Sequence, residues 1–286
     1  MDLYQRKKLF NLLCRDCSPE FIEDLRAYES LPGRIHESFE VSFELVNGLR
    51  MDSMRIAIMC LYRKRVLEWI SLRYRRTPWD KNLLLNNSID ACFGIGMADY
   101  SSGWSMPRIK VYHDYDCGRY ISHAARISHV RELFSIQGIQ DIDFLKDIRG
   151  LKRVHASCVD RDSTGKQNVK VYFGPFHIED LFDRLGCFLS KDEALSYKTL
   201  DKKNILPKIF YFCVKYCAEM RTIRTDMCYK TKVIVPYLKA LDRKEQIIRA
   251  LKDMYKIFPE ISLQYIGMQL APVEKLQFYF LLGEIR

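Results

Sequence analysis

RIKVYHDY at residues 108–115 and NVKVYFGPF at residues 168–176 alternate basic or tyrosine side chains with apolar ones. Side chains of a β-strand point to its two faces in turn, so each segment predicts a strand with one basic and aromatic face. The pattern returns in MRIAIM (54–59), YKTKVIV (229–235) and EKLQFYFLL (274–282). The cations on these faces are Arg55, Arg108, Lys110, Lys170, Lys230, Lys232 and Lys275, and the tyrosines are Tyr112, Tyr172 and Tyr279. Five such strands predict the inner wall of a barrel that holds an anion beside an aromatic or cationic group.

Each of these strands follows another strand pattern, which gives five β-hairpins in sequence. The first strands of the hairpins are FEVSFELV (39–46), DACFGIGM (90–97), KRVHASCVD (152–160), KIFYFCVKYC (208–217) and SLQYIGMQL (262–270). The hairpins start about every fifty residues, which is typical of an internal repeat. Helical patterns precede or separate them at residues 2–14, 19–28, 61–75, 122–149, 178–199 and 242–256. Ten antiparallel strands with helices between the hairpins favour an α+β fold, a closed barrel covered by helices and wide enough for a ligand. Paired strands argue against a parallel α/β sheet.

Composition limits the class of protein. The chain has 286 residues, 48% of them hydrophobic, so residues 1–286 can form one domain with a large core. No apolar run is long enough to cross a membrane, and the amphipathic start lacks the features of a secretory signal. The ten cysteines are irregularly spaced, often inside apolar strands, which favours reduced thiols over a disulfide framework. We therefore expect a cytoplasmic monomer with no membrane partner.

The net charge of +10 raises the alternative of a nucleic-acid-binding protein. Basic and aromatic sheet faces can bind single-stranded nucleic acid. Part of the charge, however, lies in the helical pattern after Leu61, where a solvated helix face explains it. A closed barrel does not admit a polymer easily, so we expect no nucleic-acid partner.

KRVHASCVD with NVKVYFGPF, and LQYIGMQLAPVEKLQFYFLL near the C-terminus, resemble the third and fifth hairpins of the soluble aromatic prenyltransferases. These enzymes have the ABBA fold, or PT barrel, of repeated ααββ units, and the resemblance covers the chain from about Phe39 to its end. NNSIDACFGIGMADYSS with RIKVY also resembles the branch that prenylates cyanobactin-type peptides. The resemblance implies transfer of a short prenyl group, dimethylallyl or geranyl, from its diphosphate to a side chain of a cyclic peptide. The alternative acceptor is a small aromatic compound of the phenol, indole or naphthalene type.

The resemblance also implies roles for the alternating face. It assigns the diphosphate to Arg55, Lys110, Lys170, Lys230 or Lys232, and Lys275, with Arg108 as a second choice, and the shield of the allyl group to Tyr112, Tyr172 and Tyr279. In the fourth hairpin, Tyr211 or Tyr216 is a further candidate for the shield. The chain has no DDxxD motif of the kind that holds diphosphate through Mg²⁺. We therefore expect no cofactor and no requirement for Mg²⁺.

The strand FEVSFELV carries Glu40, Ser42 and Glu44 on one face. The family lines its acceptor pocket from this strand, so Glu44 or Glu40 is the candidate for orienting the acceptor and for the general base. Ser42 and His155 are candidates for the same pocket. The alternative is a half-exposed strand whose carboxylates face solvent and a histidine with a structural role.

Overall fold

The computed structural model describes residues 38–46, 49–61, 91–100, 108–118, 120–161, 167–183, 185–202, 208–217, 221–228, 256, 262–269 and 275–282. The strands between residues 38 and 100 are described by their backbone pairing, and side chains are described in many positions from Lys110 onward. Among these residues, no helix is both long and apolar enough to cross a lipid bilayer.

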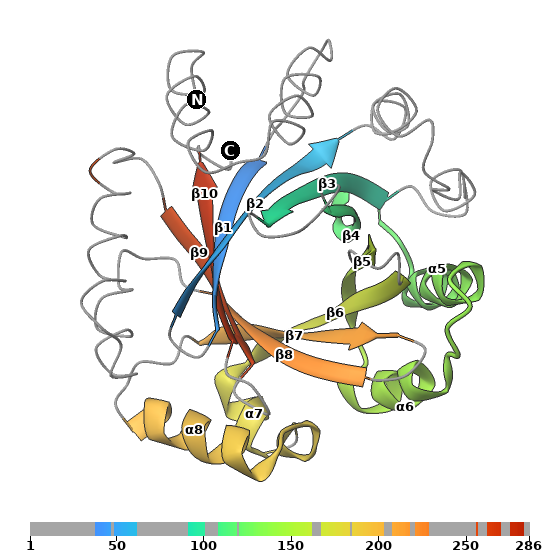
Figure 1. Ribbon diagram of the computed structural model, residues 1–286. Helices are drawn as coiled ribbons and strands as arrows, with labels where there is room; N and C mark the ends of the chain where they lie inside the picture. The colour runs from blue at the N-terminus through green and yellow to red at the C-terminus, as the bar shows by residue number, and fades with distance from the viewer. Residues whose placement is uncertain are drawn as a thin grey trace.

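Ten antiparallel strands form a closed barrel (Figure 1). Each strand pairs with its neighbours in the chain, and β1 pairs with β10 to close the sheet. Closure leaves no open sheet edge. The strands are β1 (Ser38–Val46), β2 (Leu49–Leu61), β3 (Ala91–Tyr100), β4 (Arg108–Gly118), β5 (Val154–Arg161), β6 (Gln167–His177), β7 (Ile209–Tyr216), β8 (Arg221–Cys228), β9 (Ser262–Gln269) and β10 (Lys275–Leu282).

Helices lie outside the barrel between successive hairpins (Figure 1). They are α5 (His123–Ile136), α6 (Ile142–Leu151), α7 (Ile178–Asp183) and α8 (Lys191–Lys202), with a short 3₁₀ helix at Gly186–Phe188. Side-chain hydrogen bonds cap the first turns of α5 and α8. The Ser122 side chain accepts a hydrogen bond from the Ala125 amide at the start of α5. Ser190 and Glu193 form a reciprocal capping box before α8, with hydrogen bonds of 2.9 and 3.2 Å.

The hydrophobic core lies between the barrel and these helices. On the outer face of β6, Phe173 packs against Phe144 of α6, with ring centroids 6.2 Å apart. On β7, Phe212 contacts Phe188 and Tyr216 contacts Phe134 of α5. The phenylalanines at 144, 173 and 212 are fully buried, and each contributes about 1.5–3 kcal/mol by leaving water.

The side chains that alternate with this core point into the barrel. Tyr112, Lys170, Tyr172, Tyr211 and Lys215 are partly exposed, whereas their outward neighbours on the same strands are buried. Some inward residues are buried as well, among them Lys110 and Cys213. The apolar core is therefore outside the barrel wall, and solvent reaches polar and aromatic side chains inside it.

The fourth hairpin corrects the sequence prediction. The partner of β7 is β8, Arg221–Cys228, and not residues 229–235. The polar sequence of β8 lies largely between the two segments expected to form this hairpin, and Thr225 is buried on its outer face, where its hydroxyl forms a hydrogen bond with Tyr197 of α8. The link between β7 and β8 is short, as hairpin connections usually are. Lys230 and Lys232 lie outside the described residues.

The other expected hairpins are confirmed, and the pattern at residues 122–149 forms two helices. Within the described residues, α5 and α6 precede the hairpin of β5 and β6, so this part has the expected ααββ order. The helical patterns at residues 2–14, 19–28 and 242–256 lie outside the described residues, as does most of 61–75, of which Leu61 ends β2.

Candidate active site

Lys110 and Tyr112 lie on β4 and point into the barrel. The backbone register pairs Lys110 with Gly96 and Asp160, and Tyr112 with Gly94 and Cys158. Because Gly94 and Gly96 have no side chains, β3 leaves space beside both residues. Lys110 is only 4% exposed, so its ammonium group lies in the wall and not at a rim.

Lys170 and Tyr172 occupy the corresponding positions on β6. Lys170 is paired with Cys158 and with Lys215 of β7. Lys215 was not among the predicted site residues, because it lies on the first strand of its hairpin and the predicted cations lie on the second strands. The alternation in FYFCVKY could have identified it, because Lys215 follows Tyr211 and Cys213 at every second position.

The three tyrosines expected to form the shield lie near one another. Tyr172 keeps some exposed surface, but desolvation inside the barrel raises its pKa well above the usual value, and the neighbouring Cys213, Tyr112, Cys158 and Tyr279 raise it further. Tyr172 is therefore a neutral phenol at any physiological pH. The ring of Tyr279 also lies close to that of Tyr265, with centroids 6.4 Å apart. We call Tyr112, Tyr172, Tyr265 and Tyr279 the aromatic wall.

Tyr211 and Tyr216 were both candidates for this wall. The ring centroids of Tyr211 and Tyr265 lie 6.2 Å apart, so Tyr211 points into the barrel. Tyr216 points outward, where its hydroxyl donates a 2.6 Å hydrogen bond to Asp147 of α6. Only Tyr211 can contribute to a shield.

The backbone register places the remaining candidates around β1. Ser42 pairs with Tyr279 on one side and with Arg55 on the other. Arg55 in turn pairs with Ala98, and Ala98 with Arg108. Glu44 pairs with Gln277, and Glu40 with Leu281 and Ala57, while Lys275 pairs with Val46 and Gln269. Ser42, Arg55 and Tyr279 thus share one level of the barrel.

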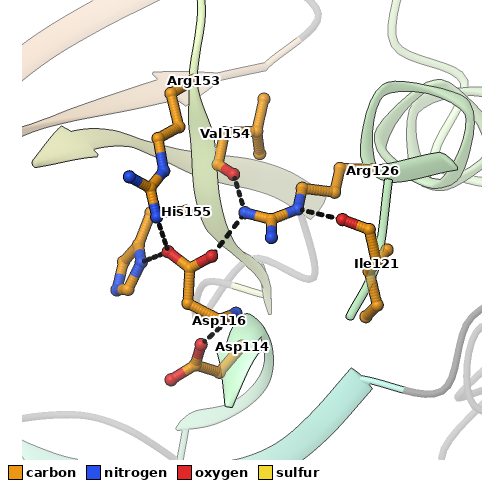
Figure 2. Close-up of polar contacts among 7 residues, drawn as sticks. All are labelled: Asp114, Asp116, Ile121, Arg126, Arg153, Val154 and His155. Atoms are coloured by element: carbon orange, nitrogen blue, oxygen red, sulfur yellow. Dashed lines mark hydrogen bonds and ion pairs between the residues drawn. The ribbon is translucent and has the colours of Figure 1, made fainter. Parts of the chain in front are cut away.

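His155 belongs to an ionic cluster centred on Asp116, at the end of β4 (Figure 2). The Nδ1 atom of His155 lies 2.6 Å from Asp116 Oδ2, and Arg153 also contacts Oδ2, at 3.1 Å. Arg126 of α5 contacts Oδ1 at 2.7 Å. Burial tends to raise the pKa of Asp116, but the hydrogen bonds from His155 and Arg126 outweigh it and lower the pKa below 3.8. Asp116 was not predicted as a site residue, because its partners come from distant parts of the chain.

Within the described part of the chain, no group of three or more histidine, cysteine, aspartate or glutamate side chains is arranged to hold a metal ion. The described cationic side chains on inward positions of β4, β6 and β7 are Lys110, Lys170 and Lys215.

Comparison with known proteins identifies the fold. No family model matches this chain, and no curated protein matches its sequence. Among solved structures, a 6-dimethylallyl tryptophan synthase matches with a TM-score of 0.66 at 11% identity, over 96% of this chain and 94% of that chain. AnaPT from Neosartorya fischeri matches with a TM-score of 0.61 at 11% identity, over 100% and 97% of the two chains. The 5-dimethylallyl tryptophan synthase from Streptomyces coelicolor, solved in complex with DMASPP and Trp, gives 0.63 at 12% identity, over 98% and 93%. This chain therefore has the fold of the dimethylallyl tryptophan synthases, the ABBA or PT barrel that its sequence resemblance implied.

Proposed function

We propose that this protein transfers a dimethylallyl group from its diphosphate to an aromatic acceptor inside the barrel. One observation carries the proposal: Lys110 and Lys170 point into the same barrel as Tyr112, Tyr172 and Tyr279, each lysine two residues from a tyrosine on its strand. Two residues along a strand span about 7 Å, so an anionic group at the lysines would place a short attached chain among the tyrosines.

The proposed chemistry needs both kinds of side chain. Breaking the allylic carbon–oxygen bond leaves its electron pair on the diphosphate, and fixed cations stabilise that developing charge. We assign this role to Lys110, Lys170, Arg55 and Lys275, with Arg108 as a further contact. The carbon left behind is an allyl cation, which the faces of neutral tyrosines stabilise through cation–π attraction. The bound acceptor, together with the barrel wall, would displace the water around the cation and so prevent its hydrolysis.

A small aromatic acceptor is better supported than a cyclic peptide. Two of the similar structures are named as dimethylallyl tryptophan synthases, and one of them was solved with Trp. The partly exposed rings of Tyr211, Tyr265 and Tyr279 offer a stacking surface for an aromatic acceptor. We propose that Ser42 and either Glu44 or Glu40 orient the acceptor from β1, and that one of these carboxylates is a candidate base.

We also propose that turnover does not require Mg²⁺, because side-chain cations take its place at the diphosphate. Activity in excess chelator should match activity in Mg²⁺. Complete loss in chelator, restored by Mg²⁺, would contradict this part of the proposal.

The proposed function is tested by product analysis. The protein is incubated with dimethylallyl or geranyl diphosphate and a panel of tryptophan, indole dipeptides, phenols, naphthalene diols and cyclic peptides, and products are identified by mass spectrometry. We expect addition of one C5 unit to an aromatic acceptor. Modification of the cyclic peptides alone would favour the peptide reading. Failure to bind a nonreactive dimethylallyl thiodiphosphate, together with salt-sensitive binding of oligonucleotides, would contradict prenyl transfer altogether.

A further inference from the structure

Asp116 and His155 form a hydrogen-bonded couple that is not part of the proposed diphosphate site. Both side chains are about three-quarters buried, with exposed fractions of 23% and 24%. Asp116 receives an ion pair on each oxygen, from Arg126 on one and from Arg153 and His155 on the other (Figure 2). Arg126 is itself fixed by hydrogen bonds to the carbonyl oxygens of Ile121 and Val154. The carboxylate therefore has little freedom to move.

The contact between Asp116 and His155 determines the tautomer of the imidazole. The lowered pKa of Asp116 keeps its carboxylate ionised, so its oxygens can only accept hydrogen bonds. His155 Nδ1 must then carry a proton and donate it across the 2.6 Å contact. The other ring nitrogen, Nε2, is consequently the proton-accepting atom of the neutral ring.

The imidazole ring is linked to the aromatic wall through Tyr211. It stacks on Tyr211 at a tilt of 36°, with centroids 4.8 Å apart, and Tyr211 leads through Tyr265 to Tyr279. Two backbone features allow this stacking across β6. The pairing of β5 with β6 shifts by one residue between Val154 and Ala156, which leaves His155 at the irregularity. On β6, Gly174 lies beside Tyr211, since a Cβ on it would come within 3.0 Å of Tyr211 Cδ1.

The position along the barrel separates this couple from the lysines. On β4, Asp116 is six residues beyond Lys110 and four beyond Tyr112. At about 3.3 Å per residue, the couple lies on the order of 20 Å from the level of Lys110 along the strand. Along β4, Lys110 therefore comes first, Tyr112 next, and the pair of Asp116 and His155 last. An acceptor that attacks the allyl carbon from the side away from the diphosphate would lie between the tyrosines and His155.

We propose that His155, held in place by Asp116, takes the proton that the acceptor loses when it is alkylated. This inference rests on the proposed prenyl transfer and assigns the base to His155 in place of Glu44 or Glu40, which would retain the orienting role. In the balanced step, the allylic carbon–oxygen bond breaks with its electrons going to diphosphate, and an electron pair of the acceptor forms the new bond to carbon. The acceptor's proton then passes to Nε2, and the imidazolium formed is stabilised by Asp116. His155 is the catalytic residue, and Asp116 is a positioning residue.

The pH dependence of transfer tests this assignment. Among the residues that the structure describes, the charged or titratable groups around the imidazole are Asp116 from β4 and Tyr211 from β7, which it contacts, and Arg153 and Arg126, which pair with the Asp116 carboxylate. A general base accepts a proton only when it is unprotonated, so the wild-type pH profile should fall on its acid side, giving an acid limb. His155→Gln should lower kcat by about a hundredfold or more, which is the usual contribution of a general base, and should abolish that limb. Asp116→Asn should move the limb to lower pH, because an uncharged amide no longer stabilises the imidazolium.

Two controls separate catalysis from folding. His123→Gln changes an exposed histidine at the start of α5 and should leave both kcat and the pH profile unchanged. Binding of dimethylallyl thiodiphosphate should stay within twofold of wild type in His155→Gln, because the lysine level is remote. Wild-type kcat in His155→Gln, with the acid limb retained, would overturn the proposal. Loss of the limb in Glu44→Gln but not in His155→Gln would also overturn it.

A second measurement does not depend on activity. Multiple-bond ¹H–¹⁵N NMR of the labelled wild-type protein at pH 8 should show a proton on Nδ1 of His155 and none on Nε2. A proton on Nε2 would overturn the assignment even if no acceptor is found. If the wild type alkylates none of the panel, prenyl transfer to aromatics fails, and the NMR result still distinguishes that failure from a wrong assignment of His155.

Discussion

Lys110 has an unusual environment for a lysine. Its side chain is 4% exposed on an inward position of β4, between Gly96 and the register position of Asp160. An anion bound at this position would meet the ammonium group away from bulk water, where attraction between opposite charges is stronger than at the surface.

We predict that Lys110→Gln weakens binding of dimethylallyl thiodiphosphate about ten- to a hundredfold. A hydrogen bond to a charged group contributes about 1.5–3 kcal/mol, and Lys110 would make one to the diphosphate. Isothermal titration calorimetry measures the effect. Lys146→Gln, which changes an exposed lysine of α6, is the matched control and should bind like wild type. Equal affinity of Lys110→Gln and wild type would remove Lys110 from the proposed site.

At the same scale, Asp116 links stability to pH. Its pKa is lower in the folded protein than the ordinary value of 3.8, so the unfolded chain takes up this proton first as the pH falls. Its stabilisation is therefore complete above about pH 4 to 5 and is lost as the pH drops through the lowered folded-state value. We predict that Asp116→Asn lowers the free energy of unfolding at pH 7 by about 1 kcal/mol, a low figure because the side chain is partly exposed.

Urea unfolding at pH 7 and at pH 3 checks this prediction, since the difference between variant and wild type should shrink at pH 3. Asp143→Asn, in an exposed pair with Lys146, is the control and should change stability by less than about 0.5 kcal/mol. A difference that grows on acidification would show that the sign of the linkage is wrong.

Among the elements, strand alternation was sufficient to predict most hairpins but failed on the fourth. The prediction used apolar residues to recognise strands, and β8, RTIRTDMC, has few of them. The buried outward side chain of β8 is that of Thr225. Its hydroxyl group forms hydrogen bonds with the Tyr197 hydroxyl and with the Met268 carbonyl oxygen. A strand stabilised by contacts with α8 and β9 cannot be recognised from its own hydropathy. For the same reason, the Asp116 cluster became visible only once β4, β5 and α5 were adjacent.

The corrected register leads to a prediction for the fourth hairpin. Arg224 pairs with Cys213, whose other neighbour is Tyr172, so it lies beside the tyrosine level. We predict that Arg224→Gln weakens binding of the thiodiphosphate more than either Lys230→Gln or Lys232→Gln. Calorimetric titration of the three variants compares them directly. A larger loss in either lysine variant would restore the original assignment.

Gly174 provides a test of how β6 supports the wall. Its φ of +128° disfavours any side chain, and a Cβ would also lie 3.2 Å from the Phe210 carbonyl oxygen. We predict that Gly174→Ala lowers the free energy of unfolding by about 1–3 kcal/mol. Gly186→Ala is the control, since its Cβ would make only an ordinary 3.6 Å contact. Equal stability of the two variants in urea would contradict the tight fit of Tyr211 over Gly174.

At the scale of the whole molecule, the outer face of the barrel is apolar and its inner face is polar. Helices α5 to α8 lie outside the barrel (Figure 1), and the apolar core lies beneath them, whereas cations and tyrosines occupy inward positions of the wall. The sequence predicted this arrangement because alternation repeated in five hairpins is not expected of a solvated sheet face. Sequence could not predict which cations lie at one level, because that depends on the stagger between strands. The pairing of Lys170 with Lys215 depends on that stagger.

The central claim is that the barrel interior binds an allylic diphosphate with its prenyl chain against the tyrosines. A crystal structure of the protein with dimethylallyl thiodiphosphate tests it most directly. We predict the diphosphate between Lys110 and Lys170, with the dimethylallyl group contacting Tyr112, Tyr172 and Tyr279. Diphosphate bound outside the barrel, or prenyl density away from these three rings, would contradict the account.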